Sequence, residues 1–114
     1  MRATLAATLS SVWGIYNGFE MCEAEPYPGK EEYLNSEKYE LKAWDYHRPG
    51  NIRDHIIKLN QIRRDNPALW DFRNVVFTGA YNEQIIGYAK VTPDGDNCIF
   101  VLVNLDPRNR QECT

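Results

Sequence analysis

The 114 residues suffice for about one small domain, so a complete eight-stranded α/β barrel of about 250 residues and a whole doubly wound nucleotide-binding fold are both excluded. Thirteen Lys and Arg residues against sixteen Asp and Glu residues give a net charge of −3, and because the basic residues are scattered, nucleic acid is not an expected partner. No run approaches the roughly 20 apolar residues of a membrane span, and three cysteines without C-x-x-C spacing favour a reducing compartment over a disulfide scaffold.

The first third of the chain predicts a helix, a strand and a long loop. Good helix formers predict a helix over residues 2–10, and the largely apolar run 12–16 predicts a short strand ended by Asn17 and Gly18. A helix followed directly by a strand is half of an α/β unit. Residues 17–51 form a polar segment with several prolines and no sustained period, and the aromatic residues spaced through it favour an ordered, packed loop.

The clearest helix is predicted over residues 52–66. Asn51 is a good N-cap, and the apolar residues that follow at 4-3-3 spacing form one stripe. They are Ile52, Ile56, Leu59 and Ile62. Pro67 cannot continue a helix, so the helix is expected to end before it.

The remainder of the chain changes to a strand pattern. Strands are predicted over 74–78, 84–92 and 98–105, and the Pro-Asp-Gly turn within 92–96 favours an antiparallel meander. The last strand is apolar on both faces, which is typical of a central strand covered on two sides. We expect either the helices or further strands of a longer protein to supply that cover.

Local motifs encode little chemistry. Five glutamates cluster in the long loop, at Glu20, Glu23, Glu25, Glu31 and Glu32, and a solvated acidic loop is favoured over a catalytic carboxylate pair. His47 and His55 lack metal-ligand spacing, so no metal and no cofactor is expected.

Aromatic residues depart most from average composition, with three Trp, seven Tyr and four Phe. They gather at Trp13, Tyr16 and Phe19, at Tyr27, Tyr33 and Tyr39, and at Trp44 and Tyr46. Packing is the favoured interpretation, and sugar stacking is the functional alternative, because a flat ring offers an apolar face beside a polar edge.

Four linked segments carry a family resemblance: R-A-T-L-A-A-T-L-S-S-V-W-G-I-Y-N-G-F-E at 2–20, E-E-Y-L-N-S-E-K-Y-E-L-K at 31–42, L-N-Q-I-R-R-D-N-P-A-L at 59–69 and V-L-V-N-L-D-P at 101–107. In this order they resemble the maltosyltransferases of the α-amylase superfamily, glycoside hydrolase family 13, which extend α-1,4-glucan from maltose 1-phosphate. The combination of G-I-Y-N-G-F-E with S-E-K-Y-E-L is specific to that branch, whereas I-R-R-x-x-P-A-L recurs across α-amylase relatives.

The resemblance implies an α+β fragment of a larger enzyme. Residues 1–70 would be the last helix, strand and helix of a TIM (β/α)8 barrel, with 17–51 as an active-site loop. Residues 71–114 would be an antiparallel meander that begins a C-terminal β-sandwich. Functional groups of such barrels lie at the C-terminal ends of the strands, so loop 17–51 would face the active site.

Site residues follow from the resemblance one by one. The family's Lys-Tyr pair that contacts the donor sugar phosphate matches Lys38 and Tyr39. The family's nucleophilic Asp, acid/base Glu and stabilising Asp come from barrel strands that would precede residue 1. We therefore expect no catalytic residue in this chain, and no activity from it alone.

The resemblance also implies partners and setting: α-glucan and maltose 1-phosphate as substrates, a homodimeric parent and a cytoplasmic location. Two alternatives stay open from the residues. One is a non-catalytic carbohydrate-binding or interaction module that uses its aromatic side chains, and the other is a fragment of an α-amylase-type hydrolase.

Overall fold

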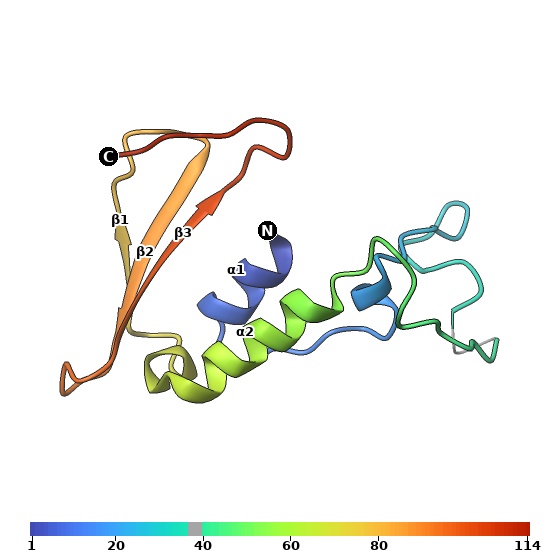
Figure 1. The fold of residues 1–114 in the computed structure, drawn as a ribbon, viewed down its shortest axis with the longest axis horizontal. Helices are drawn as coiled ribbons and strands as arrows, with labels where there is room; N and C mark the ends of the chain where they lie inside the picture. Colours follow the sequence, from blue (N-terminus) through green and yellow to red (C-terminus); the bar gives the residue numbers. More distant parts are fainter. Residues whose placement is uncertain (37–39) are drawn as a thin grey trace. The chain divides into compact units, whose positions relative to one another are not determined.

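The computed structural model describes residues 1–36 and 40–114. These divide into two compact units, one formed by Met1–Trp13 with Ile57–Thr114 and the other by Gly14–Ile56. In chain order the elements are helix α1 (Arg2–Leu9), 3-10 helix η1 (Phe19–Met21), helix α2 (Arg53–Asp65), 3-10 helix η2 (Pro67–Trp70), and strands β1 (Val75–Thr78), β2 (Ile85–Val91) and β3 (Cys98–Asn104) (Figure 1). Within the described ranges, no helix is long and apolar enough to cross a membrane.

The predicted meander is present as a three-stranded antiparallel sheet of order β1-β2-β3. Its register pairs Phe77 with Tyr88 and Tyr88 with Val101. The turn between β2 and β3 is closed by a hydrogen bond from Gly95 N to Thr92 O (2.9 Å), and Gly95 has φ +80°. Pro93 at the second position and Gly95 at the fourth position of this turn therefore act as the sequence predicts.

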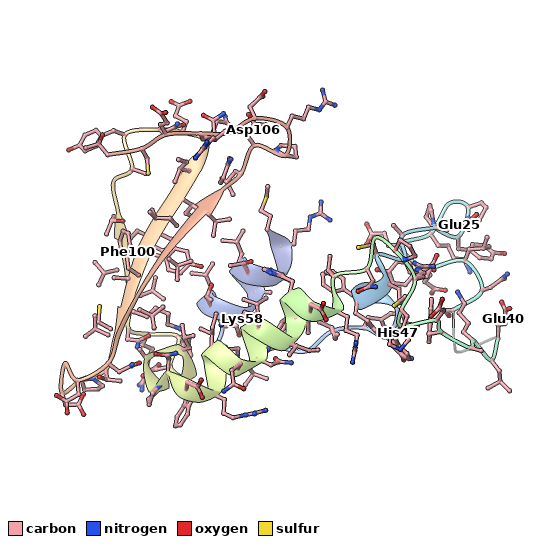
Figure 2. The ribbon with its side chains drawn as sticks, viewed as in Figure 1. Glu25, Glu40, His47, Lys58, Phe100 and Asp106 are labelled. Atoms are coloured by element: carbon pink, nitrogen blue, oxygen red, sulfur yellow. The ribbon has the colours of Figure 1, made fainter. Side chains whose placement is uncertain are left out.

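The expectation that the last strand is central is wrong for this sheet: β2 is the middle strand and β3 lies at an edge. Val101 and Val103 on one face of β3 are buried, whereas Phe100, labelled in Figure 2, and Leu102 on the other face are more than half exposed. The apolar residues on both faces of β3 are typical of a strand that is covered on two sides, but the described residues cover the face of Val101 and Val103 alone.

Residues 12–16, predicted as a strand, form none, although all five are described. A strand is stabilised by ladder hydrogen bonds to a neighbour, and within the described part of the chain no other segment pairs with this run. The helices on either side are present within one residue of the predicted bounds. The α+β content is therefore observed, and the barrel stays a prediction.

The inner face of the sheet packs around Tyr88, which is fully buried. Leu5 and Leu9 of α1 pack against the cluster formed by Tyr88, Val101 and Val103. The Thr8 hydroxyl donates its one proton to Thr4 O (2.6 Å), so the Tyr88 hydroxyl is the donor in its 2.5 Å contact with Thr8 Oγ1. Burial raises the pKa of the Tyr88 hydroxyl, which keeps it protonated as a donor.

Arg63 of α2 joins three segments of the first unit. Its guanidinium donates to the carbonyl oxygens of Ala7, Ser10 (2.9 Å), Ser11 (2.7 Å) and Leu69 (3.3 Å). Three of these carbonyls lie in or just after the last turn of α1, where helix carbonyls lack intrahelical partners and a positive charge is favourable. We call this group the Arg63 cluster.

Removing the Tyr88 hydroxyl should cost little and removing the ring much. Tyr88→Phe leaves Thr8 bonded to Thr4, so we expect the free energy of unfolding to fall by about 1 kcal/mol. Tyr88→Ala opens a cavity and should cost about 3–5 kcal/mol. Urea unfolding measures both, and Tyr81→Phe, at a ring that is 93% exposed, is the control. Equal losses for Tyr88→Phe and Tyr88→Ala would contradict the assigned packing.

Loss of the Arg63 cluster should destabilise the first unit strongly. Arg63→Ala removes four charge-assisted hydrogen bonds, and we expect a loss of about 3 kcal/mol in unfolding free energy. Arg64→Ala changes the same residue type at the next, exposed position and should stay within about 0.5 kcal/mol. Urea denaturation midpoints compare the two, and similar values would show that the cluster contributes nothing.

Asp106 orders the segment after β3. Its carboxylate accepts hydrogen bonds from Arg108 N (2.8 Å), Asn109 N (3.1 Å), Asn109 Nδ2 (2.9 Å) and Gln111 Nε2 (2.8 Å). These bonds, that from Arg108 N first, lower the pKa of Asp106 to about 2.

A depressed carboxyl pKa stabilises the folded segment only while the carboxyl is ionised. The contribution of Asp106 should be complete above its unfolded pKa of about 3.9 and be lost as the pH falls through about 2. Carbon-13 NMR of the side-chain carboxyl checks this, and Asp106→Asn should abolish the effect. A titration midpoint near that of free aspartate would disprove the hydrogen-bond set.

Candidate functional site

The second unit begins with a tight turn from Tyr16 to Phe19. Phe19 N donates to Tyr16 O (3.0 Å), and Gly18 has φ +96° and ψ −15°, the third position of a type II turn. A Cβ atom at Gly18 would lie 3.0 Å from the ring of Trp44. Glycine is therefore required at this position both for its backbone conformation and for the close approach of the indole.

Glu20 differs from the expected solvated glutamate. It is buried, its Oε2 accepts from Gly18 N (3.2 Å), and its carbonyl oxygen accepts from Ile52 N (2.8 Å). This carboxylate therefore holds the turn in place, and the prediction of a solvated side chain is wrong at this position. Glu25, Glu31 and Glu32 are exposed as expected.

Residues 25–34 fold back on themselves. Tyr27 N donates to Glu32 O (2.6 Å), Leu34 N donates to Glu25 O (2.8 Å), and Pro26 and Tyr33 form a bridge between these bonds. This arrangement brings Tyr33 against Tyr16, with ring centroids 5.4 Å apart and planes tilted by 36°. We call these two rings the tyrosine pair.

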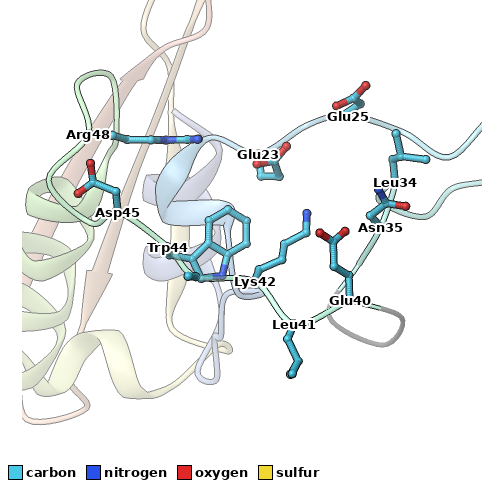
Figure 3. A pocket seen from close by; sticks show the side chains of 11 residues that line it. Glu23, Glu25, Leu34, Asn35, Glu40, Leu41, Lys42, Trp44, Asp45 and Arg48 are labelled. Atoms are coloured by element: carbon cyan, nitrogen blue, oxygen red, sulfur yellow. The ribbon is translucent and has the colours of Figure 1, made fainter.

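A polar hollow of about 500 Å³ lies within the second unit (Figure 3). Its charged lining consists of Glu23, Glu25, Glu40, Asp45, Lys42 and Arg48. The Lys42 ammonium lies 5.2 Å from the ring centroid of Trp44, a cation–π distance, and Arg48 donates through Nη2 to Met21 O. Both cations are thus engaged with the protein.

Lys38 and Tyr39, the predicted donor-contacting pair, lie outside the described residues. On either side of them, Glu40 N donates to Ser36 O (3.0 Å), and Glu40 also lines the hollow. The proposed role of the pair stays a prediction.

His47 and His55 do not come together with other metal-ligating groups. Outside residues 37–39, no group of three or more His, Cys, Asp or Glu side chains is arranged to hold a metal ion. His47 instead donates its backbone N–H to Asp45 Oδ1 (2.9 Å) in a local turn. Its visible role is therefore structural.

The tyrosine pair is the feature that the sequence did not indicate. The sequence places Tyr16 with Trp13 and Phe19, and Tyr33 with Tyr27, because only neighbours along the chain can be grouped without a structure. The signal for the pair was the turn chemistry, namely Asn17-Gly18 after Tyr16 and Gly29 in the folded-back segment, where Gly29 has φ +74°.

Comparison with known proteins finds relatives along nearly the whole chain. A protein from Myxococcus xanthus named alpha-1,4-glucan:maltose-1-phosphate maltosyltransferase is 54% identical over 112 residues, which are 98% of this chain and 17% of the relative. A protein of the same name from Rhodospirillum rubrum is 56% identical over 96% of this chain and 16% of its own length. Another from Corynebacterium glutamicum is 51% identical over 100% of this chain and 18% of its own length. The chain therefore spans less than a fifth of the length of these curated relatives.

A family model described as "GLGE, C-terminal" matches residues 77–114. This range begins within β1 and includes β2 and β3. The strand-rich end of the chain is therefore similar to the C-terminal part of that family.

Proposed function

Because this chain belongs, as one segment, to the family of α-1,4-glucan:maltose-1-phosphate maltosyltransferases, we propose that the complete protein transfers maltosyl units from maltose 1-phosphate to the non-reducing end of α-1,4-glucans. The proposal rests on sequence identity above 50% between this chain and these relatives, over 96–100% of the chain. The matched ranges therefore include both the loop and the sheet.

The proposed reaction proceeds with retention in two steps. A carboxylate outside this segment attacks the anomeric carbon, the bond to the phosphate oxygen breaks, and inorganic phosphate leaves. The 4-hydroxyl of the glucan then attacks the glycosyl-enzyme, gives its proton to a general base, and regenerates the carboxylate. This segment would contribute binding groups from loop 17–51 and no catalytic group.

The proposed context places residues 1–70 at the end of a TIM barrel and residues 71–114 at the start of a C-terminal β-sandwich. The outer face of the sheet supports the second assignment, because Val76, Phe100 and Leu102 are each more than half exposed there. A sheet face of this composition is normally covered by another layer. A cytoplasmic, homodimeric enzyme completes the proposal.

The proposed donor contact is tested in the complete enzyme. A lysine ammonium bound to a sugar phosphate forms a charge-assisted hydrogen bond, so Lys38→Ala should raise KM for maltose 1-phosphate by about ten- to a hundredfold. Tyr39→Ala should act in the same direction. Phosphate release at varied donor concentration measures both.

Lys30→Ala is the matched control, because Lys30 lies in the same loop with its ammonium 5.1 Å from the Tyr27 ring centroid. It should leave the donor KM unchanged. Unchanged donor KM in Lys38→Ala and Tyr39→Ala would exclude the donor contact. No phosphate release by the unmodified complete protein would exclude the activity itself.

A further inference from the structure

The tyrosine pair forms one wall of a groove in the second unit. The groove has a volume of about 400 Å³ and is lined by Tyr16, Glu31, Glu32, Tyr33 and Ser36. Tyr16 is 50% exposed, and Tyr33 lies beside it partly buried. Two adjoining aromatic rings thus meet solvent next to two carboxylates and a hydroxyl.

This combination matches the chemistry of a pyranose chain. The C–H faces of sugar rings are apolar and pack on aromatic rings, while the hydroxyl groups around the ring edge need hydrogen-bond acceptors. Glu31 and Glu32 are exposed acceptors at the groove, and Ser36 can both donate and accept. The groove thus offers both kinds of contact to a polysaccharide.

The charge of the groove discriminates between a neutral and an anionic sugar. Among the described residues, its titratable lining groups other than tyrosine are the carboxylates of Glu31 and Glu32. Two cations lie nearby, and both are engaged with aromatic rings: the Lys30 ammonium lies 5.1 Å from the ring centroid of Tyr27, and the Lys42 ammonium lies 5.2 Å from that of Trp44. A sugar phosphate with about two negative charges is repelled by such carboxylates, whereas an uncharged glucan is not.

The backbone fixes the groove before any ligand binds. Tyr16 is the first residue of the Tyr16–Phe19 turn, and Tyr33 lies at the bridge between the Tyr27–Glu32 and Leu34–Glu25 hydrogen bonds. A preorganised surface loses less conformational entropy on binding than a free loop does. The rings of Tyr16 and Tyr33 are therefore held in place, packed against each other, before a ligand binds.

We propose that the tyrosine-pair groove is a binding subsite for the neutral α-glucan acceptor, with sugar rings stacked on Tyr16 and Tyr33. The assignment of α-glucan rests on the proposed function. The assignment of the groove to the acceptor rather than the donor rests on its charge.

Alanine variants of the complete enzyme test the subsite. Tyr16→Ala and Tyr33→Ala should each raise KM for maltoheptaose as acceptor by about fivefold to tenfold, which is the loss of one stacking contact. KM for maltose 1-phosphate and kcat should not change. Tyr33→Phe keeps the ring and should retain most of the acceptor affinity.

Tyr27→Ala is the matched control. Tyr27 lies in the same folded-back segment and is similarly exposed, at 45%, but it does not line the groove. It should leave both KM values unchanged. An unchanged acceptor KM in Tyr16→Ala and Tyr33→Ala overturns the proposal, and a rise in donor KM alone assigns the groove to the donor and overturns it as well.

A second measurement needs no variant. Addition of maltoheptaose to the unmodified complete protein should shift the NMR signals of the Tyr16 and Tyr33 rings and leave those of Tyr27 in place. Absence of these shifts at millimolar maltoheptaose overturns the subsite even if a variant fails to fold. If the NMR shifts are absent while the complete protein still releases phosphate, the subsite proposal is wrong and the proposed activity stands.

Discussion

The first unit depends on one side chain, the guanidinium of Arg63. Its hydrogen bonds join the end of α1, the two residues after α1, and η2. The partners at the end of α1 and just after it lie 52 to 56 residues away along the chain. Burial lowers the pKa of Arg63, so the carbonyl oxygens compensate a real desolvation cost. Lysine cannot replace it, because a single ammonium cannot present planar donors to four carbonyls.

Lys90 on β2 is affected by the positive charge of Arg63. Its side chain is fully buried, and among the described residues its Nζ has no hydrogen-bond partner. Burial first, and then the positive charge of Arg63, lower the pKa of Lys90, while Asp71 opposes the shift. Lys90 therefore binds its proton less strongly than a solvated lysine does, and its apolar stem fits the inner face of the sheet.

Local physical rules predicted α1, α2 and the three strands of the sheet to within a residue, because caps, stripes and turns are encoded by near neighbours. Four features escaped such rules. The edge position of β3 depends on which strands are present, and the run 12–16 finds no strand partner among the described residues. Glu20 is buried and accepts through its carbonyl oxygen from Ile52 N, which is distant in sequence. The tyrosine pair escaped for the same reason, since it joins two turns 17 residues apart.

The two units are stabilised by different forces, and this bears on where a ligand can act. Among the described residues, the buried apolar core lies mainly in the first unit, whereas Met21 and Ile56 are the buried hydrophobic residues of Gly14–Ile56. The second unit is held by backbone hydrogen bonds and buried polar contacts, which places it at the low-stability end of the chain. Under the proposed function, a glucan that binds the folded unit alone would stabilise it by RT times the logarithm of one plus the ratio of ligand concentration to dissociation constant. Binding at the proposed subsite therefore adds stability to a unit whose backbone already holds the tyrosine pair in place.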